Sequence, residues 1–293
     1  MQGTDTVVLD GRYAESRAAA LSLIAELERS VAENELRLPS LPDVVLAIRD
    51  RLADENVTLG EIVELVSSDP ALAARLMQTA NSALLFRGNG PVTTLHTAVA
   101  RLGYRMVRNV ALSLAAQQIF IGYETRAIHG PLSAIWKHSV HVAALAHRLA
   151  RFKTDLNPEE AFLAGLLHEV GKLYILMQCK DRPELVASEA FQGVVAQWHG
   201  RVGRVVIETW GLASELADAV AGHEAEPLAV EEPVTMTALV AVANFLAEHV
   251  TRGGGSLADC PPLGALALDE ETFAWLLKAG DVDIRMLMLA FGT

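Results

Sequence analysis

Helix-start signals recur along this chain of 293 residues, and they constrain its fold more than any other feature. Thr58 followed by Glu61 forms a capping-box pattern, while Asp69-Pro70 and Asn157-Pro158 each place a capping side chain before a proline at the first helical position. Apolar residues at helical spacing follow each signal. Ala and Leu are abundant, aromatic residues make up only 5%, and alternating strand patterns are short or absent. We therefore expect an all-α protein.

Proline and glycine positions divide the chain into segments. Residues 1–15 are expected to form a loose leader and residues 16–34 an amphipathic helix, before two prolines at 39 and 42 interrupt helix formation. Residues 121–132 are expected to link two helical halves, and residues 251–264 to form a flexible break. Gly103 should end a helix, and Asp43 should cap one. The remaining expected helices cover residues 44–52, 94–102, 106–120, 136–152, 183–190, 192–209, 212–222, 235–250 and 269–291.

Composition and charge exclude several functions. The formal net charge is −12, which disfavours a broad nucleic-acid surface because phosphates are neutralised by clustered Lys and Arg. Two cysteines, Cys179 and Cys260, do not make a disulfide framework, and they favour a reducing, cytoplasmic location. The first residues lack the apolar core of a secretory signal, and no charge-free stretch is long enough to span a bilayer, so no membrane role is expected.

The stretch Ala164–Lys172 places ionisable side chains inside an otherwise apolar run. It reads AGLLHEVGK, so His168 and Glu169 stand side by side, followed by Gly171 and Lys172. Burying an imidazole and a carboxylate is costly unless each has a partner. A metal centre and a closed hydrogen-bond network both satisfy this requirement. The stretch does not match the metalloprotease pattern, because the fourth residue after His168 is Lys172 and not a second histidine.

Further histidines lie on the neighbouring expected helices. His138 and His141 share a helix face, His199 precedes a helical run, and His223 ends another helix, while Asn244 lies midway along the next. Imidazoles and carboxylates on successive helices of a bundle can converge on a transition metal. The predicted metal ligands are therefore His138, His168, Glu169, His199 and His223, with Asn244 as a weaker candidate. The expected cofactor is one or two divalent ions of iron, manganese or zinc.

Arg101, Arg105 and Arg108 follow one another at spacings of four and three residues. Such a trio can hold a phosphate or an acidic partner, and it is also typical of a solvated helix face. Both readings stay open from the sequence.

Several ordered segments resemble the HDOD domain family, helical signal-output relatives of the HD-type metal-dependent phosphohydrolases. The resemblance covers residues 36–250. It is carried by Leu38-Pro39-Ser40-Leu41-Pro42, Ser68-Asp69-Pro70-Ala71-Leu72, Thr79-Ala80-Asn81-Ser82-Ala83, Thr97–Gly103, Trp136-Lys137-His138-Ser139, Gly165–Lys172, Trp198–Gly203 and Glu208–Leu212. It implies an HD-like bundle with an N-terminal half over residues 36–122 and an HD-like half over residues 132–250. Residues 1–35 and a C-terminal helical extension over residues 251–293 lie outside it.

The resemblance also implies an incomplete catalytic set. Glu169 stands where the HD enzymes carry an aspartate, Gly222 where a second histidine is common, and Asn244 about where they place a last aspartate. The expected function is non-catalytic regulation in bacterial signalling, through binding of a protein partner or a small ligand. The alternative is a metal-dependent phosphohydrolase for a phosphodiester or a nucleotide, in which Glu169 and Lys172 would be the catalytic residues.

Overall fold

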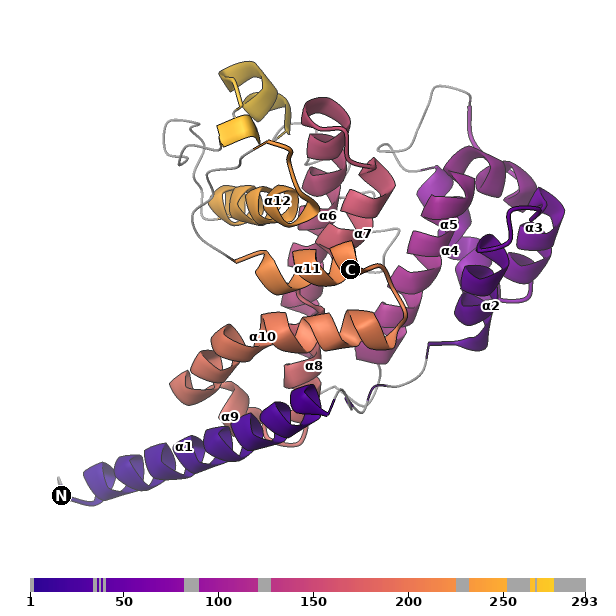
Figure 1. Cartoon of the computed structure of the whole chain (residues 1–293). Coiled ribbons are helices and arrows are strands. Elements are labelled where there is room, and N and C mark those ends of the chain that lie inside the picture. The colour runs from indigo at the N-terminus through magenta and orange to yellow at the C-terminus, as the bar shows by residue number, and fades with distance from the viewer. Residues whose placement is uncertain are drawn as a thin grey trace.

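The computed structural model of the chain describes residues 3–33, 36, 38, 41–81, 90–120, 128–224, 232–251, 264–266 and 268–276 (Figure 1). Every regular element in these ranges is helical, which confirms the all-α prediction. In chain order the elements are α1 (Gly3–Ala32), α2 (Asp43–Leu52), α3 (Leu59–Ser67), α4 (Pro70–Ala80), α5 (Leu95–Phe120), α6 (His129–Lys153), α7 (Pro158–Leu167), α8 (Val170–Gln178), α9 (Pro183–Val186), α10 (Glu189–Thr209), α11 (Ser214–Gly222), α12 (Met236–Thr251) and the short 3₁₀ helix η3 (Gly264–Leu266).

The helix-start signals act as the sequence predicts. The Thr58 hydroxyl and the Glu61 carboxylate form the reciprocal capping box of α3. Asp69 accepts hydrogen bonds from the amides of the first turn of α4, and Asn157 does the same for α7. Asp43 differs from its predicted role, because it is the first helical residue of α2 and makes no capping hydrogen bond.

The N-terminal half packs α2, α3 and α4 against α5. Gly103 interrupts α5 with a φ of 74° and a ψ of 162°, which confirms the expected break and turns the helix into two straight pieces. Its second piece carries a long buried face that reaches α7 and α8, so α5 joins the two halves of the molecule. Arg101 lies before this kink and Arg105 follows it, so the three arginines do not share one straight helix face.

The second half is built around α6 and α7, which pack along each other (Figure 1). α12 covers α6, α7 and α11, while α10 lies across α8 and α11. The C-terminal part of α1 rests on α9 and α10, and its N-terminal part extends away from the body (Figure 1). One hydrophobic core runs through both halves.

Two sequence-based boundaries are wrong, and two others fall largely outside the described residues. Residues 3–15, expected as a loose leader, continue α1, because a helix docked at one end propagates where no proline stops it. α6 begins at His129, inside the expected linker, and residues 121–127 lie outside the described residues. Of the expected break at 251–264, only the two end residues are described, and both are helical. The expected final helix is described only over residues 270–276.

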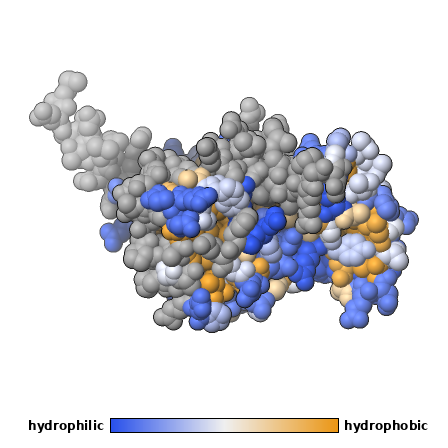
Figure 2. All heavy atoms as spheres, turned by 90° about the horizontal axis from the view of Figure 1, so that it is seen from above, coloured by the Kyte–Doolittle hydropathy of each residue, from blue (hydrophilic) through white to orange (hydrophobic). Residues whose placement is uncertain are grey.

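None of the helices in the described ranges has the length and apolar character needed to cross a membrane. Among the coloured residues in Figure 2, hydrophilic and hydrophobic residues are interspersed.

Candidate metal centre

The His168-Glu169 pair lies at a break between two helices. α7 ends at Leu167, His168 is its C-cap and Glu169 is the N-cap of α8. The start signal at Asn157-Pro158 predicts a single helix that runs through the whole AGLLHEVGK motif, and the structure corrects this prediction. The break lets two adjacent residues point their side chains into the same space, which consecutive positions of a continuous helix do not do.

Two glycines allow the surrounding backbones to approach closely. A Cβ on Gly165 of α7 would lie 2.8 Å from the Cα of Ala143 on α6, and a Cβ on Gly171 of α8 would overlap the carbonyl oxygen of His199 on α10. Only glycine permits these contacts. α6, α7, α8 and α10 are thereby drawn together around one point.

The predicted ligands meet at this point. The ring centroid of His168 lies 5.2 Å from that of His138 and 4.8 Å from that of His223, which lies 5.2 Å from that of His199. Two overlapping sets have donor atoms within 4.8 Å of one another, so that each could hold a cation. The first set is His138, His168 and Glu169, and the second is Glu169, His199 and His223. We refer to these five residues as the His–Glu cluster.

Backbone carbonyls orient three of the imidazoles. The Nδ1 atoms of His168, His199 and His223 lie 2.7–2.8 Å from the carbonyl oxygens of Gly165, Val195 and Val220, one turn earlier in each helix. A carbonyl only accepts, so each Nδ1 carries the proton and each Nε2 keeps a lone pair. This arrangement fixes the tautomer and ring orientation that metal-binding histidines require.

Buried polar atoms at the centre of the cluster have no partner. The Nε2 atoms of His168 and His223 and the Oε2 atom of Glu169 are inaccessible and form no hydrogen bond within the described residues. Native proteins rarely leave such groups unpaired, because each costs about 1–3 kcal/mol of desolvation. These atoms are the donor types that bind iron, manganese and zinc, so the donor set fits a divalent cation.

Burial keeps the imidazoles neutral. Loss of solvation, with neighbouring imidazoles, lowers the pKa of His168 well below its usual value, and burial lowers the pKa of His223 to about 3. Neutral imidazole is the metal-binding form, so no proton has to leave these two side chains at neutral pH.

Lys172 and Glu224 close one side of the cluster. The Lys172 ammonium lies 2.6 Å from Glu169 Oε1 and 2.9 Å from Glu224 Oε1. Burial alone would lower the pKa of Lys172, but these two carboxylates outweigh it and raise the pKa. Glu224 Oε1 also lies 3.4 Å from His199 Nε2. Glu224 lies 55 positions after Glu169 in the chain, and no local sequence pattern places this second carboxylate beside the first.

Asn244 contacts the cluster through His138, and its role as a weaker metal ligand stays a prediction. Its Oδ1 accepts a hydrogen bond from His138 Nε2 at 2.8 Å, so it orients a histidine of the cluster. His141 belongs to neither metal-binding set in the described residues. His147 lies edge-on to Phe162, and His249 stacks against Phe245, both away from the cluster.

The helical architecture and the His–Glu cluster define a helical protein of the HD-like class. The sequence profile of the HDOD domain matches residues 38–226, so the chain belongs to the HDOD domain family. α12, which follows the matched segment, packs on the same body.

Solved structures share the fold. A proposed metal-dependent phosphohydrolase from Shewanella amazonensis SB2B superposes with a TM-score of 0.70 at 22% identity, covering 94% of this chain and 99% of that one. An HDOD domain protein of unknown function from Geobacter sulfurreducens gives a TM-score of 0.63 at 24% identity, covering 94% and 99%. At these identities the likeness establishes the fold.

An uncharacterized protein from Treponema pallidum (strain Nichols) is 25% identical over 234 residues. The aligned region covers 75% of this chain and 44% of that protein, so this chain spans less than half the length of the relative.

Proposed function

We propose that this chain is a regulator in bacterial signal transduction that acts by binding, and that its His–Glu cluster holds one or two divalent metal ions. The observation that carries the metal proposal is the set of buried, unpartnered atoms on His168, Glu169 and His223, three residues that belong to the two overlapping donor groups. A protein partner, a small ligand and a cytoplasmic location belong to the same proposal.

The cluster residues would hold the metal, and the rest of the shell would position them. His138, His168, Glu169, His199 and His223 are the ligands in this proposal. When bound, a divalent ion supplies positive charge and Lewis acidity to the site. Lys172 holds the Glu169 carboxylate through Oε1, the oxygen that also lies 3.7 Å from His168 Nε2 and 4.0 Å from His223 Nε2.

Two features favour binding over turnover. His168, Glu169, His199 and His223 have exposed fractions of 0–4%, so a phosphate ester has little access to them. The Lys172 ammonium lies 2.6 Å from Glu169 Oε1, so one of the two oxygens of the cluster's buried carboxylate is already occupied and is less available to orient a water molecule. A bound metal in such a closed site stabilises the bundle and the surface that partners meet.

The test is a turnover assay on protein loaded in turn with Mn²⁺, Fe²⁺ and Zn²⁺. The substrates are bis-p-nitrophenyl phosphate, cyclic dinucleotides and nucleoside monophosphates. We expect no turnover above that of His168→Ala. The control is His129→Ala, an exposed histidine on the helix that carries His138. Metal-dependent turnover that is kept in the His129 variant and lost in the His168 variant would contradict the regulatory proposal.

One observation favours the alternative, a metal-dependent phosphohydrolase. His138 is only half-buried and the Glu224 side chain is 44% exposed, so the cluster has one side near solvent. Lys172, at that side, could neutralise a substrate phosphate, with Glu169 positioning water. Under this alternative, Lys172→Gln would raise KM for the phosphate ester in the same assay.

A further inference from the structure

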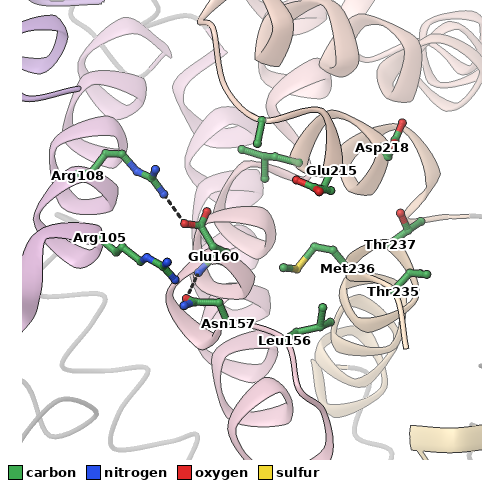
Figure 3. A pocket seen from close by; sticks show the side chains of 12 residues that line it. Arg105, Arg108, Leu156, Asn157, Glu160, Glu215, Asp218, Thr235, Met236 and Thr237 are labelled. Atoms are coloured by element: carbon green, nitrogen blue, oxygen red, sulfur yellow. Dashed lines mark hydrogen bonds and ion pairs between the residues drawn. The ribbon is translucent and has the colours of Figure 1, made fainter. Parts of the chain in front are cut away.

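A cavity that is separate from the His–Glu cluster lies elsewhere in the molecule. It has a volume of about 690 Å³, within the range of small-molecule sites. Figure 3 shows its residues on or next to four helices, with α5 on one side, α7 in the middle, and α11 and α12 on the other side. We refer to it as the junction cavity, because α5 belongs to the N-terminal half and the other three helices to the HD-like half.

Most charges that line the junction cavity are already neutralised. Arg108 pairs with Glu160 at 2.6 Å, and Asp218 pairs with Arg204 at 2.6 Å. Arg105 and Glu215 are the exceptions, since neither side chain forms an ion pair or hydrogen bond with any residue in the described ranges. The cavity therefore presents one free cation from α5 and one free anion from α11.

Apolar side chains also line the cavity. They are Leu156, Leu216 and Met236, and Figure 3 shows the Met236 side chain pointing from α12 into the cavity, on the side opposite Glu160 and Arg105. Leu216 is buried, while Leu156 and Met236 are half-buried and keep surface for a ligand to cover. An unpaired guanidinium on one wall, an unpaired carboxylate on the opposite wall and half-buried apolar side chains in the same cavity form a complementary surface for a zwitterion.

We propose that the junction cavity binds a small zwitterionic ligand, whose carboxylate or phosphate meets Arg105, whose amine meets Glu215, and whose apolar middle lies on Met236. A ligand held this way contacts both halves of the molecule at once. The cavity lies at the N-terminal ends of α7 and α11, whose C-terminal ends lead into His168 and His223. A helix of ten residues is about 15 Å long, so the ligand does not touch the cluster. The proposal therefore stands whether or not the cluster binds metal.

The test uses the full chain and a series of ω-amino carboxylates from aminobutanoate to aminooctanoate, with hexanoate and hexylamine as single-charge controls. Affinity is measured by calorimetry on chelator-treated protein, and location by the ¹³C-methyl resonance of Met236, assigned with Met236→Leu. We expect one chain length to bind at least tenfold more tightly than either single-charge compound and to shift the Met236 resonance.

Variants separate the proposed contacts from general charge effects. Arg105→Gln and Glu215→Gln remove exposed side chains without touching the core, and each should weaken the best ligand about tenfold. Arg151→Gln and Glu271→Gln, exposed charges outside the cavity lining, should bind as the wild type does. The proposal is overturned if no member of the series binds better than hexanoate and hexylamine, or if the Arg105 and Glu215 variants match the wild type. If hexylamine shifts the Met236 resonance as much as the best zwitterion does, the contact is a nonspecific apolar one, and this result would also overturn the proposal.

Discussion

Replacing Gly171 with alanine perturbs the closest approach in the candidate site. A Cβ at this position would overlap the His199 carbonyl oxygen and lie 2.8 Å from the Gly203 amide nitrogen. Both atoms belong to the backbone of α10, so no side-chain rotation can relieve the overlap. α8 and α10 must separate, and Glu169 at the start of α8 moves away from His199.

The magnitude follows from the packing. Forcing an extra methyl group into a close-packed contact costs about 1–3 kcal/mol, and a backbone contact belongs at the upper end of that range. For a domain of this size, 1 kcal/mol corresponds to roughly 2–4 °C in Tm. We therefore expect the Tm of Gly171→Ala to fall by about 6–12 °C.

The control is Gly193→Ala on α10. A Cβ there meets nothing within 4 Å, and the position is helical and exposed, so alanine should stabilise the helix by up to about 1 kcal/mol. Scanning calorimetry of both variants with the wild type gives the comparison. A Gly171→Ala protein with wild-type or higher Tm would refute the reasoning, because it would mean that α8 and α10 are not held in contact there.

Three further outcomes are expected. Asn157→Ala removes the N-cap of α7 and should lower the free energy of unfolding by about 1 kcal/mol in urea titrations, while Asn157→Asp should not. The hydrogen bond from the Thr58 amide, with further partners, lowers the pKa of Glu61 to about 2. The stabilisation by ionised Glu61 is therefore present above its ordinary pKa of 4.5 and is lost as the pH falls toward 2. The difference in Tm between the wild type and Glu61→Gln should shrink as the pH is lowered across that interval. Asn244→Ala removes the hydrogen-bond partner of His138 and should weaken Zn²⁺ affinity about tenfold in chelator competition, whereas unchanged affinity would mean that His138 is not a ligand.

Local signals in the sequence account for much of the fold. The caps at Thr58, Asp69 and Asn157 and the break at Gly103 act through neighbours within four residues, so their pattern is visible in the chain itself. The sequence does not predict the break between α7 and α8, because the AGLLHEVGK stretch contains no proline or capping residue that would indicate a helix end.

The site depends on contacts between residues that are far apart in the chain, and local sequence patterns do not show such contacts. The spacing of the histidines predicted their convergence, and the structure brings all five predicted ligands together; their role as ligands stays a prediction. Glu224 joins the cluster only because α11 folds back on α10, a contact between two helices that no short sequence pattern marks. The junction cavity depends on four separate elements, so no short pattern marks it.

The central claim is that the His–Glu cluster holds a metal. The most direct measurement is elemental analysis of protein purified without added metal, for the wild type, His168→Ala and the exposed control His129→Ala. The account predicts iron, manganese or zinc at about one or two ions per chain in the wild type and the control, and loss of that metal in His168→Ala. Wild-type protein without metal that also fails to take up any of these ions on dialysis against them would contradict it.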